Sequence, residues 1–284
     1  MNKTKLGSKT AKGGFANEKD ICKKFNNWIA DKEAKEWLEI MGYNSDKIDF
    51  VKAIQIPTRI KKEDLEKFSI IERDYSEFVK FKKADAQIKI IIKIGSILKI
   101  ENLSLKKVTI KKNKLNSGFN QVDKRWIDAY QQIWHFDNEI ALGLKLFTGE
   151  IKPPKEITSR TKIRDKRRLY LDELPGHLRD KIVGFLKNNK ILIVSDILKG
   201  RGGLSADWML VTRYDELQNI TTWTLKDINM AMNFFGYGDV TVSKNGSLHI
   251  GKISMQRKGG DAGRPTANML QFKFKPCELF EIKC

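Results

Sequence analysis

Two strand-like runs near the carboxyl end, 247–255 and 269–274, are joined by a glycine-rich segment, 256–268. Its three glycines allow sharp turns and a close approach of the backbone to a partner. Between them stand side chains suited to base edges in a DNA major groove: arginine and lysine for guanine, glutamine and asparagine for adenine, and a carboxylate for cytosine. The pattern predicts a β-hairpin whose connection either contacts nucleic acid or is an ordinary basic surface loop.

The charge balance narrows the class of partner. The chain has 54 Lys+Arg against 35 Asp+Glu, a formal net charge of +19, which favours nucleic acid or an anionic membrane. The longest apolar run, 88–100, is interrupted by lysines and is too short to span a membrane. The first residues lack the apolar core of a signal peptide, and the three cysteines have no metal-ligand spacing. We expect a protein of the reducing cytoplasm, without membrane association.

Apolar spacing predicts an α/β fold, with a mixed central β-sheet flanked by helices and a mixed α+β region toward the carboxyl end. Helices are expected near 17–29, 31–42, 126–134, 138–147, 178–186 and 228–235, and strands at 50–56, 86–94, 98–103, 105–111, 191–198, 208–212 and around 240, 250 and 272. The helical spacing of Trp126, Tyr130 and Trp134 indicates a core stripe. The expected domains are 1–151, with a charged insertion near 58–83, then a basic linker at 152–168, and 169–284.

One polar constellation suggests catalysis. Asp85 opens a predicted strand, and Ser104 and Lys106 share one face of a later strand because side chains alternate. If these strands are neighbours, a carboxylate, a hydroxyl and an ammonium group meet in a patch suited to Mg²⁺-assisted phosphodiester hydrolysis. Glu101 has the opposite strand parity, and Glu18 on the first helix could supply a second acid through a water. Taken alone, the spacing is more typical of a strand-end aspartate paired with a surface lysine.

Four stretches of the chain, 6–20, 118–126, 200–202 and 256–273, carry a family resemblance. The chain resembles the monomeric GCGC-cutting type II restriction endonucleases, MspI-like relatives in the PD-(D/E)XK nuclease superfamily. The resemblance implies a restriction-endonuclease-like catalytic core in 1–151, a DNA-recognition domain in 169–284, and Asp85 and Lys106 as catalytic residues. It also implies one or two Mg²⁺ ions held by Asp85, Ser104 and the Leu105 backbone carbonyl. Ser104 departs from the amide of these enzymes and from the acid usual in the superfamily.

The resemblance further implies that the loop 118–124 and the glycine-rich segment contact DNA, with Phe119 as a wedge between base pairs or a buried anchor. The expected DNA-binding residues are Lys9, Lys12, Phe119, Asn120, Gln121, Asp123, Lys124, Arg201, Gln256, Arg257, Lys258, Asp261, Arg264, Thr266 and Asn268. The implied partners are double-stranded DNA and a cognate DNA methyltransferase, with the enzyme a monomer or weak homodimer. The alternatives are a sequence-specific DNA-binding protein without nuclease activity and an RNA-binding protein, for which only Phe119 offers a stacking aromatic.

Overall fold

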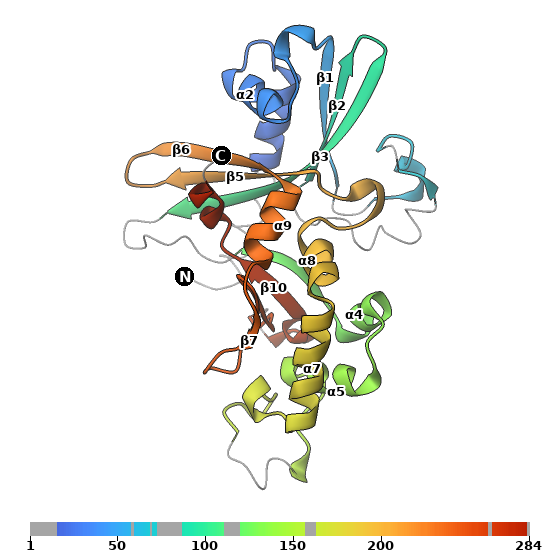
Figure 1. Cartoon of the computed structure of the whole chain (residues 1–284), viewed down its shortest axis with the longest axis vertical. Helices are drawn as coiled ribbons and strands as arrows, with labels where there is room; N and C mark the ends of the chain where they lie inside the picture. Colours follow the sequence, from blue (N-terminus) through green and yellow to red (C-terminus); the bar gives the residue numbers. More distant parts are fainter. Residues whose placement is uncertain are drawn as a thin grey trace. The chain divides into compact units, whose positions relative to one another are not determined.

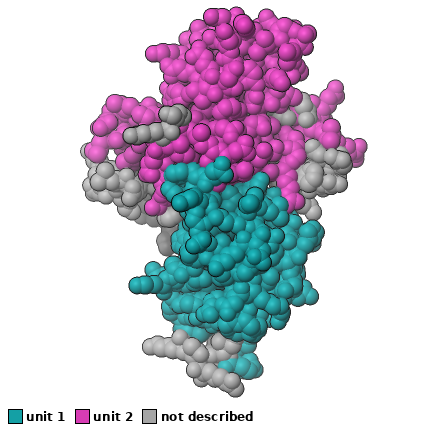
Figure 2. All heavy atoms as spheres, in the orientation of Figure 1, with its two compact units in different colours: residues 1–6, 119–197, 233–274 teal, residues 7–118, 198–232, 275–284 magenta. Residues whose placement is uncertain are grey.

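The computed structural model describes most of the chain, namely residues 16–57, 60–68, 70–72, 87–110, 120–156, 163–260 and 263–282. The chain divides into two compact units, each assembled from separate stretches of sequence (Figure 2). Unit 1 comprises residues 1–6, 119–197 and 233–274, and unit 2 comprises residues 7–118, 198–232 and 275–284.

Unit 2 is built around a five-stranded sheet with the strand order β1-β2-β3-β5-β6 (Figure 1). The strands are β1 (Phe50–Gln55), β2 (Gln87–Ile94), β3 (Ile97–Ile110), β5 (Trp208–Asp215) and β6 (Ile220–Asp227). β3 and β5 run parallel, whereas the other neighbouring pairs are antiparallel. The sheet is therefore mixed, and the α/β class expected from the sequence is confirmed.

One face of this sheet is covered by a helix at 16–26 and by α2 (Lys32–Ile40). Phe25 and Trp37 from these helices join Leu103 and Leu105 from β3 in a single buried cluster. Asp31 caps α2, which begins where the sequence predicts a helix, since the Asp31 Oδ1 accepts a hydrogen bond of 2.9 Å from the Ala34 N–H. The first helix ends at residue 26, before the expected end near 29, and Ile29 is 70% exposed.

Short 3-10 helices complete unit 2. Phe280 of η8 lies under the Arg213 guanidinium, 4.3 Å from the ring centroid, and η8 contacts β3, β5 and β6. Leu204 of η5 closes a small second cluster with Phe68 and Ile70, part of the charged insertion. The bounds are η1 (Ser45–Lys47), η2 (Lys62–Asp64), η5 (Gly202–Leu204) and η8 (Pro276–Glu281).

Unit 1 contains a second five-stranded sheet, entirely antiparallel, with the order β4-β10-β9-β8-β7. Its strands are β4 (Asn120–Arg125), β7 (Val240–Val242), β8 (Leu248–Ile250), β9 (Ile253–Arg257) and β10 (Leu270–Phe274). Its helical elements are α4 (Ile127–Trp134), α5 (Asn138–Thr148), η4 (Leu171–Glu173), α7 (Gly176–Asn188) and η7 (Pro265–Asn268). The division between the units falls inside α8 (Lys190–Leu198) and α9 (Ile228–Gly236).

The core of unit 1 is aromatic. Tyr130 and Trp134 stack with ring centroids 4.6 Å apart, and both meet the edge or face of Phe272 on β10. Phe235 packs against Phe274 in the same sheet, at 4.5 Å. The prediction that Tyr130 and Trp134 belong to a core stripe is confirmed, whereas Trp126 is the N-cap residue of α4 and remains 36% exposed.

The strand-like run 247–255 forms two strands rather than one. β8 and β9 are separated at Gly251, whose φ of +55° lies in the left-handed region that favours glycine. A Cβ at this position would lie 2.5 Å from the Tyr237 carbonyl oxygen and 2.7 Å from that of Phe235. The chain therefore reverses here, and β9 rather than β8 pairs with β10.

The apolar run 191–198, predicted as a strand, is helix α8. Ile193, Val194, Ile197 and Leu198 are buried, a spacing of one helical face, while Ile191 is 86% exposed. A short apolar run cannot be assigned to helix or strand by periodicity alone. Here the run lies in a helix that begins at Lys190, two residues after the end of α7 at Asn188.

Two further expectations need correction. The segment 118–124 is not a loop where the structure describes it, because residues 120–125 form strand β4. The two strands expected at 98–103 and 105–111 are one strand, β3. The two units do not coincide with the expected ranges 1–151 and 169–284, because β5, which follows the expected linker, pairs with β3 in the sheet of unit 2, and β6 pairs with β5. A parallel pair of neighbouring strands needs a crossover connection of about a dozen residues or more.

Candidate functional site

The alternation of side chains along β3 separates a polar face from an apolar one. Leu103 and Leu105 point into the helix-covered cluster, so Ser104 and Lys106 share the other face. Both are buried, with Ser104 1% and Lys106 9% exposed. The expectation that these two residues share a face of one strand is confirmed, but a surface lysine is not what the structure contains.

Strand pairing extends this polar face sideways. Ser104 pairs with Gln87 of β2 on one side and with Met209 of β5 on the other, and Met209 pairs with Lys226 of β6. β2 and β3 are therefore neighbours, which meets the condition that the sequence argument set for this patch. Asp85, the expected carboxylate, lies outside the described residues.

The Ser104 hydroxyl is chemically distinctive. Its Oγ is buried and has no hydrogen-bond partner among the residues that the structure describes. A buried hydroxyl in this state is destabilising unless another group, such as a metal ion, a water or DNA, contacts it.

Glu101 does not compete for the acidic role. Its carboxylate accepts a hydrogen bond of 3.0 Å from Trp208 Nε1 and a short one from the Tyr43 hydroxyl. Burial, and then the bond to Glu101, raises the pKa of Tyr43 above its usual value. Glu101 is thus bound to aromatic side chains and, as its strand parity predicts, belongs to the face opposite Ser104.

The structure does not bring Glu18 onto the face of Ser104 and Lys106. Glu18 is 1% exposed on the helix 16–26, and its carboxylate accepts a short hydrogen bond from Gln55 Nε2. Gln55 follows Val51 and Ala53 on the helix-covered side of β1. Glu18 therefore contacts the helix-covered side of β1, and its role as a second acid acting through a water stays a prediction.

Sequence reasoning missed two features of the polar face. Lys226 is a second buried lysine on this face, 7% exposed. It lies in β6, a strand that was not predicted, so its face could not be predicted either. The Asp207 carboxylate accepts a hydrogen bond of 2.8 Å from the Asn102 N–H, and the Asp207 N–H donates back to the Asn102 carbonyl. An acid one residue before a strand would have been the sequence signal for this link.

Unit 1 brings together two of the segments expected to contact DNA. Strands β4 and β9 lie on either side of β10, where Lys124 and Gln256 both pair with Gln271. These three residues lie on the face opposite the aromatic core of Phe272, and so does Lys273, whose pKa is lowered by burial. This face, defined by Lys124, Gln256, Gln271 and Lys273, is called the polar face of unit 1.

Other expected readers are bound within unit 1. Asp123 pairs with Phe272 on the aromatic side, and its Oδ2 accepts hydrogen bonds from Arg125 Nε at 3.1 Å and from the Tyr130 hydroxyl at 3.2 Å. Asn268 Oδ1 accepts from Arg257 Nη2 at 2.6 Å. These side chains hold the fold of the segment, a role that composition alone could not separate from base reading.

The remaining expected residues are distributed as follows. Arg264 is exposed, and Lys258 and Thr266 are half-buried, all next to the glycine-rich turn in unit 1. Asn120 and Gln121 are half-buried on β4, and Arg201 is half-buried immediately before η5 in unit 2. Lys9, Lys12, Phe119 and Asp261 lie outside the described residues.

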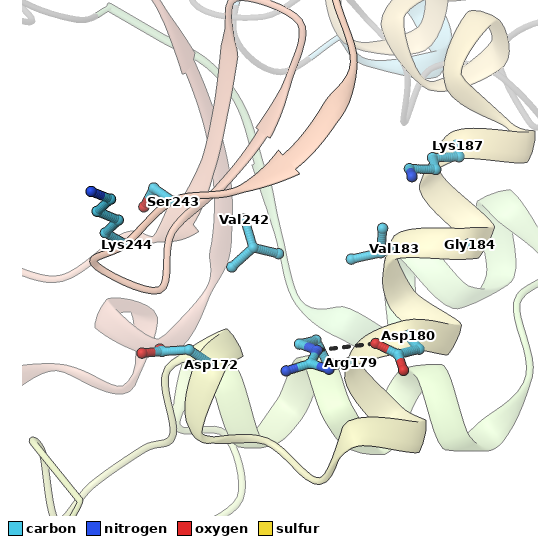
Figure 3. Close-up of a pocket in the computed structure, with 9 residues that line it drawn as sticks. All are labelled: Asp172, Arg179, Asp180, Val183, Gly184, Lys187, Val242, Ser243 and Lys244. Atoms are coloured by element: carbon cyan, nitrogen blue, oxygen red, sulfur yellow. Dashed lines mark hydrogen bonds and ion pairs between the residues drawn. The ribbon is translucent and has the colours of Figure 1, made fainter.

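A pocket of about 580 Å³ in unit 1 lies between α7 and the turn after β7 (Figure 3). Its charged lining includes Lys187, Lys244 and the Arg179–Asp180 ion pair, which is 3.0 Å long. No residue expected from the sequence lines this pocket, so it is distinct from both polar faces.

Comparison with known proteins identifies the chain. The family model of the R.HinP1I restriction endonuclease matches residues 64–280, which include β2, β3 and the glycine-rich segment. No curated protein matches the chain. Within the described ranges, no helix is long and apolar enough to cross a membrane. The chain therefore belongs to the R.HinP1I restriction endonuclease family and is a type II restriction endonuclease that cuts DNA.

Proposed function

We propose that this endonuclease hydrolyses both strands of duplex DNA at GCGC with the help of Mg²⁺, leaving 5'-phosphate and 3'-hydroxyl ends. The observation that carries the catalytic part is the burial of Ser104 and Lys106 side by side on one face of the central strand β3. We assign the acidic role to Asp85 because of its position in the sequence. It stands two residues before Gln87, which pairs with Ser104.

The donor set is compatible with Mg²⁺, which prefers oxygen ligands and retains several waters. Ser104 offers a buried hydroxyl with no partner among the described residues, Leu105 offers its carbonyl, and Asp85 supplies the charge. No three His, Cys, Asp or Glu side chains cluster within the described ranges, so the proposal depends on Asp85 and on DNA phosphate oxygens. When bound, Mg²⁺ would lower the pKa of a coordinated water and offset negative charge at the scissile phosphate.

Lys106 has a separate task. Its ammonium group, held on the polar face by a largely buried stem, attracts a phosphoryl oxygen and orients the attacking water. Low solvent exposure strengthens this interaction, because water screens the charge less there. Lys226, two strands away on the same face, adds positive charge to the region that the phosphate enters.

Sequence specificity is assigned to the glycine-rich segment and the polar face of unit 1. Lys258 and Arg264 can donate to guanine, and Asp261 can accept from the amino group of cytosine. The family resemblance supports GCGC as the site and a cognate methyltransferase that protects host DNA. One catalytic patch per chain cuts a palindrome one strand at a time, or as a weak pair of chains, in the cytoplasm.

A specific observation favours one alternative function. The Ser104 side chain is shorter than the acid usual at this position, and it is neutral. The competing proposal is therefore a protein that binds GCGC without cutting it. An RNA-binding function is less favoured, because the sequence offers only one candidate stacking aromatic, Phe119.

The test uses supercoiled plasmid DNA, Mg²⁺ and sequencing of the fragment ends. Lys106→Met retains most of the apolar stem but removes the ammonium group, and Lys99→Met is the matched control on an exposed position of the opposite parity in β3. We expect wild type and Lys99→Met to cut at GCGC. Lys106→Met should bind a GCGC duplex in Ca²⁺ but not cut it in Mg²⁺.

The outcomes separate the two proposals. Specific binding by wild type without any nicking in Mg²⁺ would establish the binding protein. Cleavage by Lys106→Met at the wild-type rate would remove Lys106 from the mechanism, and fragment ends at another sequence would overturn GCGC.

A further inference from the structure

Gly149 brings two arginines against the end of helix α5. It follows the last helical residue with a φ of +83°, and a Cβ there would lie 2.9 Å from the Arg167 carbonyl oxygen and 3.4 Å from Arg168 Cβ. The Leu169 N–H also donates to the Leu146 carbonyl, at 2.9 Å. The absence of a side chain at Gly149 thus permits the backbone of 167–168 to pack here, where the helix carbonyls favour cations.

The Arg168 guanidinium is held in place by several contacts, but not all of its N–H groups are hydrogen-bonded to the described residues. Its guanidinium lies over the Tyr170 ring, 4.1 Å from the centroid, and its Nη1 is 3.4 Å from the Phe147 carbonyl oxygen. The side chain is only 14% exposed, and its nearest carboxylate, that of Asp165, is 3.8 Å away. Arg168 Nε has no hydrogen-bond partner among the described residues. That nitrogen is buried and faces Asp165 Oδ2 at 3.8 Å, so a further acceptor would approach the terminal nitrogens of the guanidinium group.

Arg257 reaches the same place from strand β9. Its Nε and Nη2 donate to Asn268 Oδ1, at 3.2 and 2.6 Å, and Asn268 Nδ2 donates to the Gly149 carbonyl at 2.8 Å. Arg257 pairs with Leu270, so it lies on the face opposite Gln256 and away from the polar face of unit 1. Burial, followed by the charges of Arg168 and Arg167, lowers the pKa of Arg257.

The charge around Gly149 is unbalanced. Three guanidinium groups converge, and the carboxylate that acts on them is Asp165, which already makes a two-point ion pair of 2.9 Å with Arg167. An added anion with several acceptor oxygens would relieve the repulsion between these guanidinium groups. Arginine is well suited to this, because its planar fork matches phosphate geometry.

We propose that Arg168 and Arg257, with Arg167 at the rim, bind one backbone phosphate of the DNA duplex beside the recognition site. The inference rests on the proposed function and deepens it, since it assigns Arg257 to positioning rather than to base reading. Phosphate contacts fix the register of a protein on DNA without carrying sequence information. The hydrogen bonds between Arg257 and Asn268 would transmit this register to the glycine-rich segment, because these two residues lie near its two ends.

The experiment measures binding to GCGC and scrambled duplexes in Ca²⁺ across a salt series, for wild type, Arg168→Gln and Arg257→Gln. Arg164→Gln is the matched control, because Arg164 lies over the same Tyr170 ring at 4.1 Å but is ion-paired with Asp172 and Glu173. Removing one phosphate contact should reduce the salt dependence by about 0.9 in logarithmic slope, or about 3.5-fold over a fourfold change in salt. Both duplexes should be affected equally.

A second arm locates the phosphate. A set of GCGC duplexes, each with one neutral methylphosphonate, is tested with the same proteins. We expect one position at which the neutral group weakens binding of wild type and of Arg164→Gln, but not of Arg168→Gln or Arg257→Gln. A structural role alone would weaken binding at every position alike, and thermal unfolding of each variant checks the fold.

The results distinguish the two levels of the proposal. If wild type prefers GCGC but no methylphosphonate position cancels the effect of Arg168→Gln, the phosphate site is wrong and the proposed function stands. If Arg257→Gln alters the preference for GCGC over the scrambled duplex, Arg257 reads a base and the assignment fails. If wild type binds no duplex, both proposals fail.

Discussion

Removal of the Ser104 hydroxyl should stabilise the protein and weaken its use of metal. Ser104 Oγ is buried without a partner among the described residues, and a group in that state costs about 1–3 kcal/mol. Ser104→Ala deletes one oxygen and leaves little space, so we expect the free energy of unfolding to rise by about 1 kcal/mol. The same change should raise the Mg²⁺ concentration for half-maximal cleavage, although less than Asp85→Ala does.

Thr212→Val supplies the matched control on the neighbouring strand. Thr212 is 5% exposed, and its hydroxyl lies 3.1 Å from Asn17 Oδ1 and 3.5 Å from the Lys106 carbonyl oxygen. Loss of these contacts should lower the free energy of unfolding by about 1 kcal/mol. Urea denaturation in EDTA measures both variants, and cleavage across a Mg²⁺ series measures metal use. If Ser104→Ala destabilises the protein as much as Thr212→Val does, the hydroxyl has a structural partner and the reasoning is refuted.

Three other substitutions have defined expectations. Gly251→Ala forces an alanine into the left-handed region and against two carbonyl oxygens, so it should lower the free energy of unfolding by more than about 1 kcal/mol. Gly184→Ala, in helix α7 with open space around it, should raise the free energy of unfolding by about 1 kcal/mol. Urea denaturation compares the two variants. Asp31→Ala should cost about 1 kcal/mol through loss of the α2 cap, and an unchanged denaturation midpoint would contradict the cap. Gln256→Ala should cost about 1–3 kcal/mol of binding at one base pair, and equal loss on scrambled DNA would assign Gln256 to the backbone.

Local signals in the sequence predicted local structure well. Asp31 and Gly42 bound helix α2 as expected, because capping and a left-handed glycine depend on residues within one helical turn. Strand parity also predicted that Ser104 and Lys106 share a face and that Glu101 does not. Alternation is a property of the strand itself and needs no tertiary contact.

Features that depend on distant segments were not predictable in the same way. The run 191–198 is apolar apart from Ser195 and Asp196, and its helical state is decided by which side chains pack. Arg257 and Gln256 are adjacent in sequence, yet pairing with β10 sends them to opposite faces. The division into units could not be predicted from the sequence either, because it depends on the pairing of β5 with β3 rather than on a change of composition.

The parallel pairing of β5 with β3 has a consequence for synthesis of the enzyme. The Asn102–Asp207 hydrogen bond, at the start of this pairing, joins residues 105 positions apart in the chain. A ribosome-bound chain that ends before β5 would leave one edge of β3 open and Lys106 without its neighbour Val211. The face that carries Lys106, proposed above as catalytic, would therefore be completed only after most of the polypeptide has been made, so DNA cleavage that depends on it could not begin earlier.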